Sequence, residues 1–224
     1  MHEAIAWSYD LLEPAQQTVF RRLAVFDGGC SLQALEAVCR GTGGETDLLD
    51  GVEALHRGSL LWIEETAGGH TRLRMLETVG EYGAERLDER GEEVQVRRRH
   101  AEYFLGVAAE AARGLTDPGA ALWLDRLERD HDNLRAALRW CVHQRNTELG
   151  LGLAAALWWF WYVRGYVSEG RTHLAALLSL PEASGLSAAR AHALLGAGQL
   201  AQTQADYMGG GLPGPEPHPV PRPG

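Results

Sequence analysis

Helical periodicity without any strand signal, over more than half of the chain, is the feature that most constrains the fold. From residue 92 to about residue 207, apolar residues recur every three or four positions and no alternating stretch is found. The breaks between these segments are short, so neighbouring helices are expected to run antiparallel, as in a helical repeat array. The predicted helices span about residues 94–111, 118–143, 148–163, 167–178 and 187–206.

The first 90 residues predict a different arrangement. Apolar stripes predict helices up to about residue 57, with Ser31 and Asp47 as N-caps and the glycines at 28 and 29 ending the second helix. Residues 59–63 and 71–75 predict the two strands of a hairpin, and residues 76–89 predict a helix. Helices, then a two-stranded wing, then a helix is the order of a winged-helix domain.

The predicted fold class is therefore mainly α. Residues 1–90 are expected to form a winged-helix domain with a small β-hairpin, and residues 91–207 an antiparallel, tetratricopeptide-like repeat domain. Residues 208–224 are expected to be a disordered tail, because residues 209–224 hold six Pro and five Gly. The tail is read as a solvated end, with docking into an SH3-like groove as the alternative.

Composition excludes several functions. Hydrophobic residues make up 45% of the 224 residues, which is enough for a core, and the net charge of −9 disfavours nucleic acid and anionic membranes. All 21 basic residues are Arg, which excludes a Schiff base or a P-loop lysine. Cys30, Cys39 and Cys141 are widely spaced, as expected of buried thiols in a reducing compartment. The apolar run at 149–163 is too short to span a bilayer, so a cytoplasmic protein is predicted.

The helical part contains a recognisable repeat. Residues 157–162 (LWWFWY) open one unit, Gly165 and Tyr166 make its turn, and residues 191–196 open the next unit. Met208 is followed by the Gly/Pro tail where the partner helix of the second unit is due. The last repeat is therefore predicted to be truncated, and its uncovered apolar flank predicts self-association.

Four strings carry a more specific resemblance. They are residues 4–12 (AIAWSYDLL), 23–29 (LAVFDGG), 75–79 (MLETV) and 123–138 (WLDRLERDHDNLRAAL). In these strings, and over about residues 3–207, the chain resembles the STAND class of bacterial signal-transduction ATPases, specifically the LuxR-type transcriptional regulators.

The resemblance implies that the chain is the winged helix and first repeats of a larger regulator. In that family a P-loop ATPase domain precedes the winged helix, so ATP or ADP is expected only in a longer relative, and this chain has no cofactor of its own. The family's Met-His-Asp nucleotide sensor corresponds to Met75, Leu76 and Glu77. Leu76 replaces the histidine and offers no hydrogen bond to phosphate, so its alternative role is packing in the core.

Two charged segments are candidate nucleic-acid contacts. Residues 47–57 would be the recognition helix, but they hold three acids and one Arg, and residues 1–90 hold sixteen acids against eight Arg. Residues 97–100 (RRRH) are basic, yet on a helix these positions spread around the circumference. Direct DNA binding is therefore not the favoured interpretation. Residues 97–100 are interpreted instead as a solvated face or an interdomain ion-pair patch.

Two further clusters have alternative interpretations. Asp125, Glu128 and Asp132 share a helical face next to His131, which would suit a metal or acid–base chemistry, but ordinary ion pairing such as Asp125 with Arg129 is the favoured interpretation. The aromatic cluster is either core or a ligand surface for a protein or small effector. Its candidate partner-binding residues are Trp158, Trp159, Trp161, Tyr162 and Tyr166.

The sequence thus predicts a non-catalytic regulatory and interaction segment of a STAND-type regulator. The winged helix is expected to relay nucleotide state from a P-loop domain, while the repeats engage a partner. The alternative is a stand-alone winged-helix DNA-binding regulator.

Overall fold

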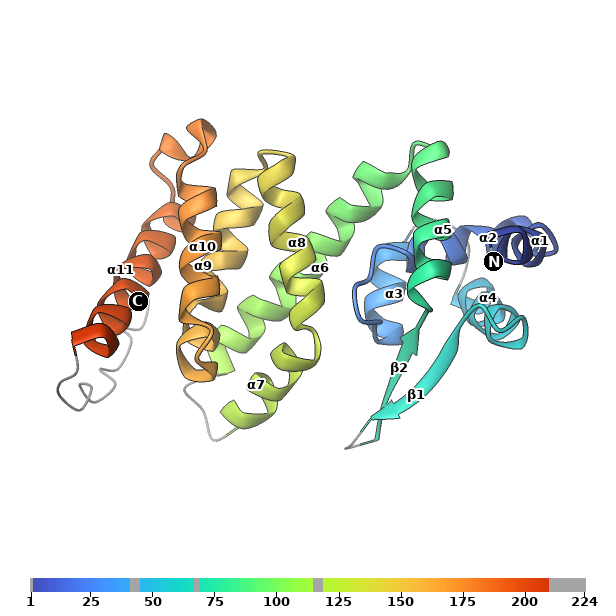
Figure 1. Cartoon of the computed structure of the whole chain (residues 1–224), viewed down its shortest axis with the longest axis horizontal. Helices are drawn as coiled ribbons and strands as arrows, with labels where there is room; N and C mark the ends of the chain where they lie inside the picture. Colours follow the sequence, from blue (N-terminus) through green and yellow to red (C-terminus); the bar gives the residue numbers. More distant parts are fainter. Residues whose placement is uncertain (1, 41–44, 67–68, 115–118, 210–224) are drawn as a thin grey trace.

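The computed structural model describes residues 2–40, 45–66, 69–114 and 119–209. In these ranges the protein is mainly α, with eleven α-helices and one small antiparallel hairpin that precedes a long helical region. The predicted fold class is confirmed at this level. Figure 1 shows the hairpin and the first helices at one end, the upright helices α8–α11 at the other, and α6 running between them.

The N-terminal half is built as the apolar stripes predict. Ser31 accepts a hydrogen bond from the Ala34 N–H and caps α3 as predicted, whereas α4 begins at Glu45, so Asp47 is not its N-cap. The elements are α1 His2–Asp10, α2 Pro14–Leu23, α3 Leu32–Cys39, α4 Glu45–Arg57, β1 Trp62–Thr66, β2 His70–Arg74 and α5 Glu77–Glu89.

The first strand lies three residues later than predicted. The chain closes the end of α4 with hydrogen bonds from Ser59 N to His56 O and from Leu60 N to Leu55 O, and Ser59 takes a positive φ of 56°. The apolar side chains of Leu60 and Leu61 are therefore buried in the core rather than forming the strand. Trp62 pairs with Arg74 at the base of the hairpin, and Thr66 pairs with His70 near its tip.

The second strand is bonded on both sides. Besides pairing with β1, it forms a bridge in which Leu73 N donates to Cys30 O at 2.8 Å and Cys30 N donates to Leu73 O at 2.9 Å. The turn before Cys30 contains Gly28 and Gly29, with φ of 72° and 86°, as predicted for the end of the second helix.

The C-terminal half contains helices only. The single helix predicted over residues 118–143 is wrong, because Asp130 (φ −100°, ψ 10°) separates α7 from α8. Residues 210–224, which carry most of the predicted tail, lie outside the described residues. The elements are α6 Glu93–Gly114, α7 Ala120–Arg129, α8 His131–His143, α9 Thr147–Arg164, α10 Val167–Leu178, a 3₁₀ turn at Pro181–Ser184 and α11 Ala188–Gly209.

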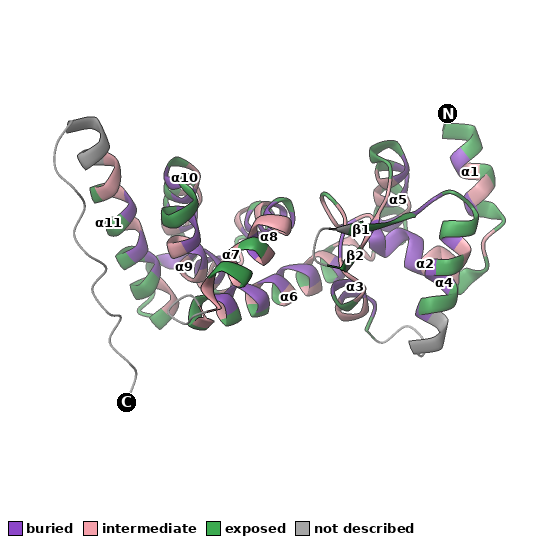
Figure 2. Ribbon diagram, turned by 90° about the horizontal axis from the view of Figure 1, so that it is seen from below, coloured by how far each residue is buried: buried purple, intermediate pink, exposed green. Residues whose placement is uncertain are grey.

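The apolar core has two large clusters joined near α6. One lies among α1–α5 and the hairpin, and the other lies among α6–α11. Phe26, in the segment after α2, packs against both clusters and against a third small one formed by Val25, Val38, Leu87 and Val96. Figure 2 shows the buried side of α11 turned toward α9. The predicted domain boundary at residue 90 stays a prediction.

The three cysteines are free and buried, as predicted. Burial raises the pKa of the Cys39 thiol to about 11 and that of Cys141 to about 12. In the ranges that the structure covers, every helix is too short or too polar to cross a bilayer.

Replacing Gly29 by Ala is expected to lower the free energy of unfolding by about 3 kcal/mol. Its φ of 86° strains any L side chain, and an added Cβ would lie 2.5 Å from the Leu73 carbonyl oxygen. Gly91→Ala is the matched control, because Gly91 also has a positive φ but has nothing within 4 Å of an added Cβ. Urea unfolding should show a loss of about 1 kcal/mol for that control; equal losses in both variants would contradict the close approach at Gly29.

Candidate functional site

Two of the predicted partner-binding aromatics are engaged in contacts between helices. Trp161 is buried and stacks on His173 at a ring distance of 6.1 Å. Tyr166 donates its hydroxyl hydrogen to Glu128 at 2.5 Å. Both side chains therefore hold helices together.

Three aromatic side chains of α9 remain partly accessible. Trp159 stacks on Tyr162 with ring centroids 5.2 Å apart, and Trp158 meets Trp159 edge to face. Trp158 also packs on α11, where a side chain at Gly196 would collide with it. Trp158, Trp159 and Tyr162 thus present surface to a partner, and Tyr166 is partly exposed besides its bond to Glu128.

The segment matching the nucleotide-sensor motif lies at the start of α5. Met75 is half-buried against the N-terminal core, while Leu76 is 55% exposed and Glu77 is exposed. The expectation that Leu76 packs in the core is wrong. Leu76 takes the N-cap position with extended backbone (φ −63°, ψ 145°), which turns its side chain outward.

The helix α4, which precedes the hairpin, presents few cations. Its Arg57 is already bound to Glu53 at 2.5 Å, and Asp50 adds a second carboxylate. Binding to a phosphate backbone depends on unpaired cations. The side chains of α4 that are described as exposed are Leu49, Asp50, Glu53, His56 and Arg57.

The basic run at residues 97–100 forms no single patch, as its helical spacing predicted. Arg97 and Arg98 bind Glu93 and Glu102, each at 2.8 Å along α6. Arg99 turns to α3 and donates to the Val38 carbonyl at 3.3 Å. His100 is buried.

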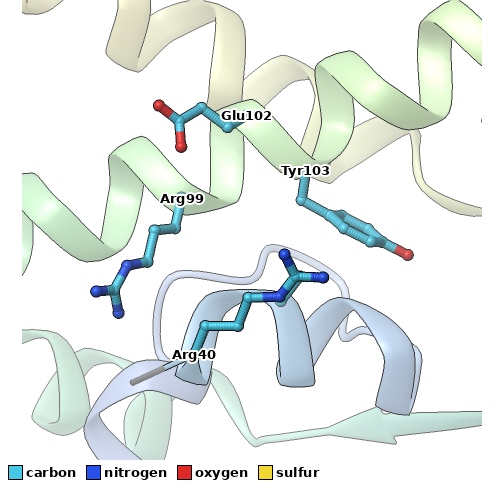
Figure 3. Close-up of a pocket in the computed structure, with 5 residues that line it drawn as sticks. Arg40, Arg99, Glu102 and Tyr103 are labelled. Carbon is cyan, nitrogen blue, oxygen red and sulfur yellow. The ribbon is translucent and has the colours of Figure 1, made fainter. Parts of the chain in front are cut away.

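A shallow pocket lies between α3 and α6, with a volume of about 360 Å³. In Figure 3 the Arg40 guanidinium points toward Tyr103, whereas the Arg99 guanidinium points away from it. Arg99 is engaged with the end of α3. The polar groups around this pocket therefore do not converge on one point, and it is not a convincing ligand site.

The acidic cluster of α7 and α8 forms ion pairs between helices. Asp125 binds Arg164, so the predicted pairing of Asp125 with Arg129 is wrong, because α7 ends at Arg129 and its acidic face meets α9. Glu169 of α10 accepts from both His131, at 2.7 Å, and Arg135. Among the residues with described positions, no group of His, Cys, Asp or Glu is arranged to hold a metal ion.

A highly connected polar site is the junction centred on Asn133 of α8. The side chain is fully buried, and its Oδ1 accepts from Asp27 N at 3.0 Å and from His100 Nε2 at 3.2 Å. Its Nδ2 donates to Gly29 O at 2.9 Å. The bond from His100 requires its Nε2 to carry the proton. We call these four residues, together with Arg72 and Asp130, the junction.

Arg72 of β2 completes the junction from the hairpin. Its guanidinium donates to Gly28 O at 3.0 Å, to Gly29 O at 2.9 Å and to Asp130 Oδ1 at 2.9 Å. The Gly28–Gly29 turn is thus held by an arginine of the hairpin and an amide of α8 at once. Figure 1 shows the hairpin and α8 as separate elements.

His100 lies among aromatic rings on the other side of Asn133. The rings of Phe26 and Phe104 are 5.1 Å and 4.7 Å from it. Burial lowers the pKa of His100 to about 4. The hydrogen bond to Asn133 raises this pKa, but its effect is smaller than that of burial. The imidazole is therefore neutral at pH 7.

The opposite side of α8 carries the His131–Arg135–Glu169 contacts. Burial alone would raise the pKa of Glu169, but hydrogen bonds from Arg135 and His131 lower it below its ordinary value. One helix therefore joins the hairpin on one side and α10 on the other through charged or polar groups.

The junction brings together two of the strings that carry the family resemblance, residues 23–29 and residues 123–138. The sequence contains both strings, but its local patterns do not predict that they meet, and they do not single out Asn133. The one hint of the contact in the sequence is that both strings are present. Asp27 and Asn133, which form a hydrogen bond, lie 106 positions apart, so local spacing does not predict the contact.

The chain is similar in sequence to large mycobacterial proteins. The chain is 35% identical over 179 residues to proteins of Mycobacterium tuberculosis and Mycobacterium bovis described as "Putative HTH-type transcriptional regulator". The match covers 80% of this chain and 20% of each relative, so the chain spans about a fifth of their length. An uncharacterized protein of Mycobacterium tuberculosis is 31% identical over 105 residues, which is 45% of this chain and 26% of that protein.

Family models and solved structures add nothing further. No family model matches the chain, and no solved structure matches it. The relationship to large mycobacterial regulators therefore rests on sequence similarity alone, over about a fifth of their length.

Asn133→Ala is expected to lower the free energy of unfolding by about 3 kcal/mol, because it leaves the Asp27 N–H and the buried His100 Nε2 without the acceptor that Asn133 Oδ1 supplies. Asn146→Ala is the matched control, since Asn146 caps α9 through one bond to Leu149 N. That loss should be about 1 kcal/mol. Denaturant unfolding with similar losses in both variants would show that the junction adds little.

Acidification is expected to weaken the fold through His100. Its folded pKa is about 4, below the ordinary value of about 6.5 for an unfolded chain. The unfolded state binds more protons between these values, so stability falls as the pH falls from about 6.5 toward 4. The loss between pH 7 and pH 5 should be about 2 kcal/mol.

His100→Gln should remove most of that loss, since an amide does not titrate. Part of the pH dependence is expected to remain, because burial also lowers the pKa of His173. The measurement is urea unfolding of both proteins at pH 7 and pH 5. An equal pH dependence in the variant would mean that His100 is not the responsible group.

Proposed function

We propose that this chain is a non-catalytic regulatory segment of a STAND-type transcriptional regulator. In this proposal the winged-helix unit, residues 1–90, relays the nucleotide state of a P-loop ATPase domain in the longer protein. The tetratricopeptide-like helices, residues 91–207, engage a protein or a small effector. The similarity to large HTH-type regulators over 80% of the chain supports this assignment.

The observation that carries the proposal is the junction around Asn133. Hydrogen bonds depend on distance and direction, and a buried amide that loses them is costly. A shift of the hairpin against α8 would separate Arg72 from Asp130 and Asn133 from Gly29. The junction therefore suits a contact that couples the orientation of one unit to that of the other.

Several features support a non-catalytic role for this chain. The buried thiols have raised pKa values, which disfavours thiolate chemistry at Cys39 and Cys141. His100 and His131 serve as structural hydrogen-bond partners. The chain has no lysine, so we propose that nucleotide binds only to a separate P-loop domain.

The helical region offers two surfaces for partners. Trp159 and Tyr162 form the stacked, partly accessible pair on α9, and we assign them to effector or protein recognition. Leu194 and Leu195 on α11 are 47% and 66% exposed, and we assign them to self-association. A cytoplasmic location fits the free thiols.

A stand-alone DNA-binding regulator is the second candidate. The order of helices and hairpin favours it, and so does the HTH description of the relatives. The acidic face of α4, with Asp50 and a paired Arg57, argues against it.

DNA titration separates the two candidates. Fluorescence anisotropy of a labelled mixed-sequence duplex at physiological salt should show no binding tighter than about 100 µM, because non-specific binders span roughly 1–100 µM under that condition. The charge-reversed variant Asp50→Arg with Glu53→Arg should gain salt-dependent affinity, which checks that α4 is presented to the duplex. Micromolar or tighter binding by the natural chain, with a steep salt dependence, would favour the DNA-binding candidate.

A further inference from the structure

The hairpin has one free edge, on β1. Strand β2 pairs with β1 on one side and with Cys30 on the other. Within the described ranges, no backbone segment pairs with the outer side of β1. Figure 1 shows β2 on the side of α3 and β1 on the outer side of the protruding hairpin.

The register fixes which backbone groups point outward. Leu73 directs its N–H and C=O to Cys30, away from β1. Its partner Ile63 therefore belongs to a non-hydrogen-bonded pair, and the N–H and C=O of Ile63 point to the outer side. By the strand's alternation, Glu65 does the same. Among described residues, neither backbone has a hydrogen-bond partner.

The side chains along this edge have a defined chemical order. Trp62 and Ile63 are 37% and 44% exposed, and Glu64 and Glu65 after them are exposed. Glu64 is partly neutralised by Arg74 at 3.1 Å, but Glu65 forms no ion pair with a described residue. The nearby Arg72 is turned away toward Asp130.

We propose that the outer edge of β1 docks an extended cationic peptide segment, which adds to the hairpin as a further strand. The outward groups of Ile63 and Glu65 supply the main-chain hydrogen bonds. Basic side chains of the segment lie opposite Glu64 and Glu65, and apolar ones lie opposite Trp62 and Ile63. This surface is separate from the junction and from the function proposed above.

Charge selects this occupant. Residues 1–90 hold sixteen acids and eight Arg, so the field of this half attracts a cationic segment. A second copy of β1 would bring Glu64 and Glu65 of two chains together, and like charges across adjacent strands are destabilising. The two acids thus oppose self-pairing and favour a basic partner.

The probes are two hexapeptides with capped ends. In acetyl-Thr-Arg-Arg-Val-Val-Thr-amide the basic pair meets the two glutamates in an antiparallel strand, and in acetyl-Thr-Val-Val-Arg-Arg-Thr-amide it does so in a parallel strand. Control peptides carry Glu in place of Arg. Titration calorimetry at low salt should show binding of one Arg peptide at least tenfold tighter than its Glu control. Amide hydrogen exchange should slow at Ile63 and Glu65 on binding.

Two variants test the edge directly. Ile63→Pro removes an outward N–H while leaving the ladder to β2 intact, since Pro is tolerated at strand edges, and Glu65→Arg reverses the unpaired charge. Each should weaken binding at least tenfold. Asp88→Arg, the same charge change at the far end of α5, should leave the affinity within twofold. Circular dichroism checks the fold of each variant.

The proposal is overturned if neither Arg peptide binds, or if Glu65→Arg binds as well as the natural chain. Binding without slower exchange at Ile63 and Glu65 would equally overturn it, because the peptide would then lie elsewhere. A dimer whose formation protects the same two amides would assign the edge to a second copy instead. If Ile63→Pro fails to fold, the charge reversal and the exchange data still decide.

Discussion

The structure depends on satisfying one buried amide. Asn133 is fully buried, and a primary amide without partners inside a protein is costly. Its partners are the Gly29 carbonyl and the Asp27 N–H, which the turn between α2 and α3 brings within reach, and His100 of α6. The left-handed backbone of that turn and its close approach to Leu73 belong to the same arrangement, which ties the hairpin to α8.

The same helix carries the constraint further along the chain. One side of α8 holds the glycine turn through Asn133, and Arg139 binds Asp27 at 2.8 Å. The other side holds α10 through Glu169. A displacement of the hairpin therefore acts on α8, which is also fixed to α10. Aromatic packing of Phe26 with both large core clusters reinforces this arrangement. Polar contacts give the orientation, and apolar contacts give most of the cohesion.

Local patterns predicted the helices well and the site poorly. Periodicity locates α9, α10 and α11 to within a few residues, because each buries one face against neighbours. It misses the break at Asp130, since Leu127 and Leu134 on the two sides keep a helical spacing and the break is held by Arg72 from the hairpin. It misplaces β1, because Leu60 and Leu61 are apolar for the core rather than for a strand. The junction joins residues more than a hundred positions apart, which no local pattern encodes.

Electrostatics gives the N-terminal half a preference among partners. Its excess of acids disfavours DNA binding at α4. Unpaired cations are needed to displace counterions from the phosphates, and the exposed Arg57 is already paired. The same excess is favourable for a cationic chain at β1, where Glu65 has no partner among the described residues and main-chain groups are free to bond. The negative charge of this half therefore disfavours a polyanion and favours a basic peptide. Because the junction lies on the opposite edge of the hairpin, at Cys30 and the glycine turn, a strand added at β1 does not compete with it for backbone groups.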